Sequence, residues 1–173
     1  KEVIDFPAYN LFVRTKVLKQ VGGYGNNFYG GEDTFLCLKL INAGFSILYD
    51  PKVLVFHHRR ALYLPYLKQI ANVGKHRGYF ARVFPQTSRK FEYFLPSVVS
   101  VGFLTLLGLS FFNNIILILF LILTLISILL GFISVIKFSN FANAFFVSLG
   151  IITSHLAYGL SFIEGLLTPK LER

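Results

Sequence analysis

The sequence predicts an α/β segment followed by a basic amphipathic helix and an all-α transmembrane region. Three observations predict this order. Residues 1–60 hold short apolar runs separated by Gly and Pro, residues 61–93 are basic, and no charged residue occurs between Glu92 and Lys137. Only 14% of the residues are charged and 54% are hydrophobic, whereas a soluble domain carries about a quarter charged residues. This composition excludes a disordered chain and disfavours a simple soluble globule.

Two helices are expected within residues 1–60. A short helical turn is predicted at 16–21, because Gly22 follows it directly. A longer helix is predicted at 34–43, where apolar residues recur at helical spacing and Gly44 stands where a helix C-cap falls.

Two strands are expected beside these helices. The runs 45–49 and 53–56 are rich in residues that favour strands, and the turn pair Asp50-Pro51 separates them. The sequence contains no sign of two long βαβ units. We therefore expect only part of an α/β domain here.

Residues 61–93 predict an interfacial segment next to the membrane. Between residues 51 and 91 there are nine Lys and Arg and no Asp or Glu. Polar and basic side chains fall along one helical stripe: Lys68, Asn72, Lys75, Tyr79 and Arg82. Such a helix is typical of binding to anionic lipid headgroups. A nucleic-acid surface is the alternative, but no known motif accompanies these charges, so we expect no nucleic-acid partner.

Three apolar segments predict transmembrane helices at about 94–112, 115–136 and 141–163, before a tail at 164–173. A helix needs about 20 apolar residues to cross the hydrocarbon core. The alternative for the first two segments is buried core helices, which a chain this short cannot cover all round. The third segment carries more polar residues, so a re-entrant or interfacial placement stays open for it.

The distribution of basic residues predicts the orientation in the membrane. Residues 1–93 carry 14 Lys and Arg against 6 Asp and Glu, and the Asn113-Asn114 turn carries no charge. The positive-inside rule therefore places residues 1–93 in the cytoplasm. We expect a multi-pass protein of the cell (inner) membrane. Three crossings would leave the C-terminus outside.

One acidic motif is a candidate for chemistry. Gly30-Gly31 precedes Glu32-Asp33, directly before the predicted helix. One carboxylate held ionised at a helix start could act as a general base on a substrate hydroxyl. The alternative is a helix N-cap, in which the same side chains only satisfy free amide groups.

The counts of sulfur-containing residues add two constraints. The one cysteine, Cys37, excludes a disulfide framework and any multi-cysteine zinc site, and its mid-helix position predicts a packing role. The chain contains no methionine and begins at Lys1. We therefore expect a fragment or a processed product.

A series of motifs in order resembles the C-terminal half of the catalytic domain of glycosyltransferase family 2, and in particular membrane-bound members that build exopolysaccharides. The resemblance covers roughly residues 5–60, with a further Gln, Gly and Arg in the basic segment. It rests on Asn10-Leu11-Phe12-Val13-Arg14, Val21-Gly22-Gly23-Tyr24, Gly30-Gly31-Glu32-Asp33-Thr34, Leu40, Gly44-Phe45, Tyr49-Asp50-Pro51, Phe56-His57-His58-Arg59, Gln69, Gly74, Arg77 and Gly78.

The resemblance implies a fold and a reaction. It implies that residues 1–60 are the C-terminal half of a GT-A domain, and that the enzyme inverts the anomeric centre while moving a sugar from a nucleotide-sugar donor to a lipid-linked or saccharide acceptor. It further implies Mg²⁺ or Mn²⁺, held mainly by a nucleotide-binding half that precedes Lys1. We expect the fragment alone to be inactive. A non-catalytic subunit that anchors or docks a partner is the alternative.

The resemblance also implies roles for individual residues. Asp33 would be the catalytic base and Glu32 would position it or the acceptor. The residues that would contact the donor diphosphate are His57, Arg59 and Arg77, and His57 would also be a tentative metal ligand. The residues that would position the acceptor are Gln69 and Gly31. The alternatives are a structural histidine at His57 and lipid-facing charges at the arginines.

Overall fold

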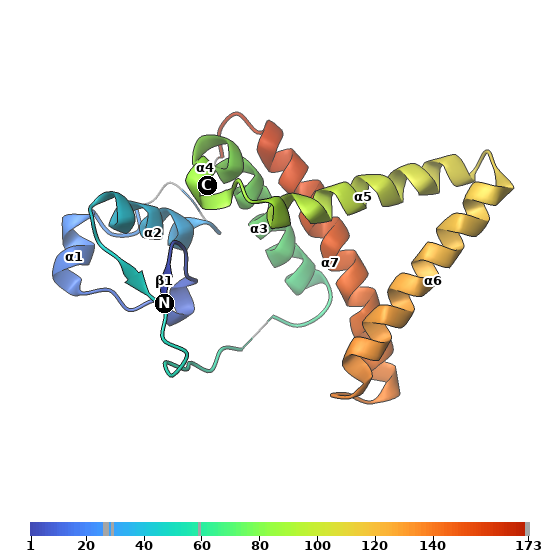
Figure 1. Ribbon diagram of the computed structural model, residues 1–173, viewed down its shortest axis with the longest axis horizontal. Coiled ribbons are helices and arrows are strands. Elements are labelled where there is room, and N and C mark those ends of the chain that lie inside the picture. The colour runs from blue at the N-terminus through green and yellow to red at the C-terminus, as the bar shows by residue number, and fades with distance from the viewer. Residues whose placement is uncertain (26–27, 29, 59, 172–173) are drawn as a thin grey trace.

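The chain folds mainly as helices. The computed structural model describes residues 1–25, 28, 30–58 and 60–171, and it is shown in Figure 1. Its elements follow one another in this order: strand β1 (Glu2–Val3), a 3₁₀ turn η1 (Ala8–Asn10), helices α1 (Thr15–Gln20) and α2 (Glu32–Asn42), strand β2 (Ile47–Leu48), and helices α3 (Leu64–Val83), α4 (Pro85–Ser88), α5 (Phe91–Ser110), α6 (Asn114–Ile136) and α7 (Phe141–Leu167).

The expected α/β class, a partial GT-A domain, is wrong for this structure. Over the described residues there is one two-stranded antiparallel sheet, in which Glu2 pairs with Leu48 and Val3 pairs with Ile47. The run 53–56 forms no strand, and its Phe56 side chain is fully exposed. A strand requires a hydrogen-bonded neighbour, and β1 supplies one only for β2. The fold is therefore mostly all-α.

Helix α2 forms where the sequence predicts a helix, two residues earlier than expected. It begins at Glu32 after Gly31, and its buried side includes Leu36, Cys37 and Leu40. Gly44 follows the helix with φ of +83°, a conformation that glycine adopts at little cost. This glycine turns the chain back so that β2 can pair with β1.

Helices α3 and α7 run side by side in parallel along most of their lengths (Figure 1). Glycines allow the two backbones to touch. A Cβ added at Gly74 would lie 2.5 Å from the Tyr158 carbonyl oxygen, and one added at Gly78 would overlap the Phe162 carbonyl oxygen. A Cβ added at Gly165 of α7 would likewise overlap the Lys75 carbonyl oxygen. No side-chain layer separates the helices at these positions.

Helices α5, α6 and α7 form a triangle, with one corner where α5 meets α6 (Figure 1). Ring contacts mark its sides: Phe103–Phe120 between α5 and α6, and Phe132–Phe141 between α6 and α7. All three helices are long and apolar enough to cross a membrane by length and composition, and α6 is the most apolar. These helices are consistent with the predicted membrane protein.

The end of α7 returns to the start of α5 and the end of α3. Phe94 and Phe162 pack with ring centroids 4.8 Å apart, and the Ser97 hydroxyl donates to the Gly159 carbonyl over 3.1 Å. Beyond α7, Leu171 is buried against Tyr79 and Phe80 of α3. The C-terminal segment is therefore part of the packing around α3.

Candidate active site

A cavity of about 490 Å³ lies between the N-terminal segment and α3. Its walls come from the η1 region, the loop and first turn of α2, the segment before α3, and one face of α3. Six of the seven predicted site residues line it: Gly31, Glu32, Asp33, His57, Gln69 and Arg77. Arg59, the seventh, lies outside the described residues. The sequence predicts these residues as one site, and the fold brings the six described ones around one space.

Asp33 is the second residue of α2 and is half-buried. Its Oδ1 accepts a hydrogen bond from the Thr34 amide over 2.8 Å, and its Oδ2 accepts one from the Ala8 amide over 3.3 Å. A carboxylate has about four acceptor positions, so these two bonds orient the group and leave acceptor capacity. Burial raises the pKa of Asp33, while the two amide hydrogen bonds oppose that rise. Gly31 is the N-cap residue of α2 and no described side chain caps the helix, so Asp33 is not an N-cap, although it satisfies one free amide of the first turn. Asp33 also lines the cavity.

Glu32 shapes the glycine loop. Its Oε2 accepts a hydrogen bond from the Gly30 amide, and Gly30 has φ of +107°. Gly31 faces α3 closely, because a Cβ at this position would lie 3.0 Å from the Phe80 ring and 3.3 Å from the His76 Cβ. Gly31 therefore lets the acidic loop pack directly against α3.

Arg77 joins three segments from one wall of the cavity. Its guanidinium donates to Asp5 and, over 3.2 Å, to the Ser88 hydroxyl, and it lies 4.9 Å from the Tyr93 ring centroid. The Thr34 hydroxyl also donates to Asp5 over 3.1 Å. Arg77 thus has a structural role in addition to any contact with substrate.

His57 stacks on Tyr9, with ring centroids 4.5 Å apart and an interplanar angle of 7°. Both rings line the cavity. Over the residues that the structure describes, no three His, Cys, Asp or Glu side chains are grouped so that they could hold a metal ion. His57 and its described neighbours therefore do not fit Mg²⁺ or Mn²⁺ by themselves.

His76 lines the cavity and was missed by the sequence analysis. It is 7% exposed, and its Nδ1 lies 2.9 Å from the Asn72 carbonyl oxygen, so Nδ1 carries the proton. In the neutral ring Nε2 is then a hydrogen-bond acceptor. Its spacing from Gln69, seven residues or two helical turns, was the available signal.

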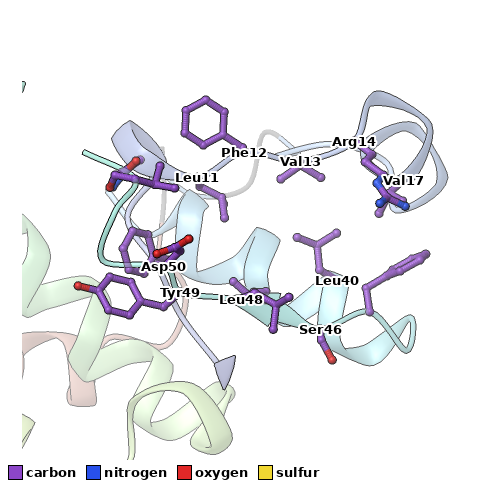
Figure 2. Close-up of a pocket in the computed structure, with 15 residues that line it drawn as sticks. Leu11, Phe12, Val13, Arg14, Val17, Leu40, Ser46, Leu48, Tyr49 and Asp50 are labelled. Carbon is purple, nitrogen blue, oxygen red and sulfur yellow. The ribbon is translucent and has the colours of Figure 1, made fainter. Parts of the chain in front are cut away.

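A second cavity of about 500 Å³ lies beside the C-terminal part of α2, where Leu40 lines it (Figure 2). Its labelled lining is largely apolar, with Leu11, Phe12, Leu40 and Leu48 among the side chains that surround it. None of the predicted site residues lines this cavity. The candidate chemistry is therefore confined to the first cavity.

The three apolar helices are consistent with a membrane protein, and in this fold carboxylates, imidazoles and guanidinium groups line one pocket. Comparison with known proteins adds a relationship to glycosyltransferases. The chain is 37% identical over 54 residues to the pre-mycofactocin glycosyltransferase of Mycobacterium tuberculosis, in the strains CDC 1551 / Oshkosh and ATCC 25618 / H37Rv. The matched segment is 31% of this chain and spans only 12% of these relatives.

Two other comparisons found nothing. No protein-family profile matches the sequence, and no solved structure matches the chain. The similarity thus supports a transferase relationship in general. Family 2, the inverting mechanism and polysaccharide synthesis stay predictions.

Proposed function

We propose that this chain is part of a membrane-bound family 2 glycosyltransferase that moves a sugar from a nucleotide-sugar donor to a lipid-linked or saccharide acceptor at the cytoplasmic face of the inner membrane. One observation carries the proposal. Asp33 borders the same cavity as His57, Gln69 and Arg77. The similarity to a glycosyltransferase supports the reaction class, and the three apolar helices support the membrane setting.

Asp33 is the general base in this proposal. It takes the proton from the acceptor hydroxyl while the hydroxyl oxygen bonds to the anomeric carbon. The bond from that carbon to the donor diphosphate breaks, and the nucleoside diphosphate leaves with the electron pair. A single displacement of this kind inverts the anomeric centre. The raised pKa of Asp33 strengthens it as a base, provided that it stays ionised at the working pH.

The remaining cavity residues have supporting roles. Glu32 and Gly31 hold the acidic loop against α3, and Gln69 positions the acceptor. His57 and Arg77 contact the diphosphate, because a guanidinium has five donors and Arg77 directs only some of them to Asp5 and Ser88. A divalent cation on the diphosphate would need ligands from outside the described residues.

The test compares two carboxylate variants in the full-length enzyme. Asp33→Asn should lower turnover by about 10²–10⁴-fold, the usual contribution of a general base, while binding of the nucleotide-sugar stays nearly unchanged. Asp50→Asn is the matched control, because Asp50 lies in an exposed turn and is absent from this cavity. Release of nucleoside diphosphate from UDP- and GDP-sugars is the readout.

Wild-type turnover in Asp33→Asn would reject the catalytic proposal. It would favour the alternative, a non-catalytic subunit that anchors or docks a partner. Equal losses in Asp33→Asn and Asp50→Asn would also reject it, because the loss would then not belong to the cavity.

A further inference from the structure

Tyr9 is the central residue of η1 and lies at the candidate active site. It lines the same cavity as Asp33, Gln69 and His76. One face of its ring is covered by His57, with ring centroids 4.5 Å apart and the two planes 7° from parallel. Tyr9 nevertheless stays 55% exposed, and its side chain has no other ring contact or hydrogen bond to any residue that the structure describes. The second face of the ring is therefore open.

Two contacts hold η1 in place on either side of Tyr9. The Ala8 amide donates to Asp33 Oδ2 over 3.3 Å, and the Asn10 side-chain amide donates to the Val53 carbonyl over 3.3 Å. The first contact ties the turn to the start of α2, and the second ties it to the segment after β2. The Tyr9 ring thus keeps a fixed position relative to the Asp33 carboxylate.

A pyranose ring matches the groups that this cavity offers. The faces of a pyranose carry C–H bonds, whereas its rim carries hydroxyl groups. The face of a tyrosine ring is apolar and electron-rich, so a C–H face of the sugar packs favourably against it. Across the cavity, α3 offers partners for the hydroxyls, because the Gln69 amide has donors and an acceptor and His76 Nε2 is an acceptor. An alkyl chain or a lone phosphate would use only one part of this lining.

The position of Tyr9 favours the acceptor sugar over the nucleotide-sugar. In the proposed reaction Asp33 takes a proton from the acceptor hydroxyl, so the acceptor binds beside this carboxylate. Tyr9 directly follows Ala8, whose amide bonds to the same carboxylate. The donor diphosphate is anionic, and the adjacent carboxylates of Glu32 and Asp33 disfavour an anion at this end of the cavity.

We propose that Tyr9 is a binding residue for the acceptor and stacks against the sugar ring that carries the accepting hydroxyl. The acceptor of this site is then a saccharide, either free or lipid-linked, and not a lipid phosphate without a sugar. This inference rests on the proposed function and adds a binding residue and an acceptor class to it. His57 supports the Tyr9 ring from the covered face, while the nitrogens at the edge of its own ring stay available to the diphosphate.

Steady-state kinetics of the full-length enzyme test the role of Tyr9 with two substitutions. Tyr9→Phe keeps the aromatic face, whereas Tyr9→Leu keeps apolar volume and removes the ring. For a sugar acceptor, Tyr9→Leu should raise KM by about three- to tenfold, and Tyr9→Phe should stay within about twofold of wild type. The KM of the nucleotide-sugar should be unchanged in both. Phe12→Leu is the matched control, because Phe12 is 78% exposed and lines the second cavity.

Two kinetic results would overturn the proposal. The first is a raised KM for the nucleotide-sugar in Tyr9→Leu with an unchanged KM for the acceptor, because the ring would then stack on the nucleobase. The second is an equal effect of Tyr9→Leu and Phe12→Leu on the acceptor KM.

A panel of acceptors tests the predicted class. It contains methyl glycosides, monosaccharides linked to polyprenyl diphosphate, and polyprenyl phosphate without a sugar. Use of either sugar-bearing acceptor supports the proposal, and the preferred one shows whether the saccharide is free or lipid-linked. Use of polyprenyl phosphate alone overturns it.

Binding measurements separate this proposal from the proposed function. In Asp33→Asn, saturation-transfer NMR should still detect the C–H protons of a bound methyl glycoside, and the added Tyr9→Leu change should remove that signal. An unchanged signal rejects the stacking role of Tyr9 alone. Wild-type turnover in Asp33→Asn, together with a signal that depends on Tyr9, rejects the catalytic role of Asp33 and leaves the sugar-binding role of Tyr9 in place.

Discussion

The guanidinium of Arg77 donates a hydrogen bond to the carboxylate of Asp5, a residue 72 positions earlier in the chain. This ion pair links α3 to the segment that precedes η1, and Thr34 of α2 bonds to the same carboxylate. Two sides of the candidate active site are therefore joined through one acidic group. The side chains of Arg77 and Asp5 are only 20% and 13% exposed, so each depends on the other for charge compensation.

Asp5→Asn should destabilise the fold by about 3 kcal/mol, because breaking a buried pair leaves the Arg77 charge uncompensated. Thermal unfolding of the purified protein in detergent measures the effect. Lys75→Gln is the control, since its pair with Glu164 has side chains 35% and 57% exposed and contributes about 0–1 kcal/mol. Similar melting temperatures for the two variants would contradict a structural role for the Asp5–Arg77 pair.

Asp33→Asn should change the pH dependence of stability. The folded-state pKa of Asp33 is raised above its ordinary value, mainly by burial. The stabilising contribution of the protonated carboxyl is therefore fully present below the unfolded-state pKa and is lost as the pH rises through the folded-state pKa. Relative to wild type, the Asn variant should be more stable at pH 7 than at pH 4. Melting temperatures across this range measure the difference, and a constant difference would show that burial does not disfavour ionised Asp33.

His76 can be tested with two variants that separate its ring nitrogens. His76→Asn keeps a donor near the position of Nδ1, which faces the Asn72 carbonyl, and removes Nε2. His76→Gln keeps a polar atom near Nε2. If Nε2 accepts a hydrogen bond from a sugar hydroxyl, His76→Asn should raise KM about tenfold or more, and His76→Gln should retain more of the wild-type affinity.

Steady-state kinetics of the full-length enzyme and melting temperatures should be measured together. A wild-type KM in His76→Asn would exclude the Nε2 contact. A loss of melting temperature in proportion to the loss of activity would assign His76 to packing.

Gly78→Ala should destabilise the contact between α3 and α7. The added methyl group would overlap the Phe162 carbonyl oxygen, and overpacking of this kind costs about 1–3 kcal/mol. Gly102→Ala is the control, because a Cβ there meets nothing within 4 Å and alanine favours the helix. The measurement is thermal unfolding in detergent. Equal stability in both variants would show that the two helices separate easily.

Local signals in the sequence predicted several elements. The helix at 34–43 is confirmed because its apolar spacing and Gly44 act within one segment, and α6 agrees closely with the expected 115–136. The strand at 53–56 is wrong because strand formation depends on a partner that no local pattern reveals. The predicted α/β class is wrong for the same reason, because among the described residues the expected strands beyond β1 and β2 do not form.

Contacts between distant segments could not be predicted. Gly74 and Gly78 are visible in the sequence, but only the fold shows that they face Tyr158 and Phe162. The full lining of the cavity also depends on contacts between distant segments. Motif resemblance selected Asp33 and Gln69, whereas His76 belongs to the site only because Gly31 brings the acidic loop against α3.

Helix α3 packs against the acidic loop on one face and against the α7 backbone on another. At Gly74, Gly78 and Gly165 no side-chain layer lies between the α7 backbone and α3, the helix that carries His76 and Gln69. A shift of α7 would therefore reach this wall of the cavity directly, without passing through rotatable side chains.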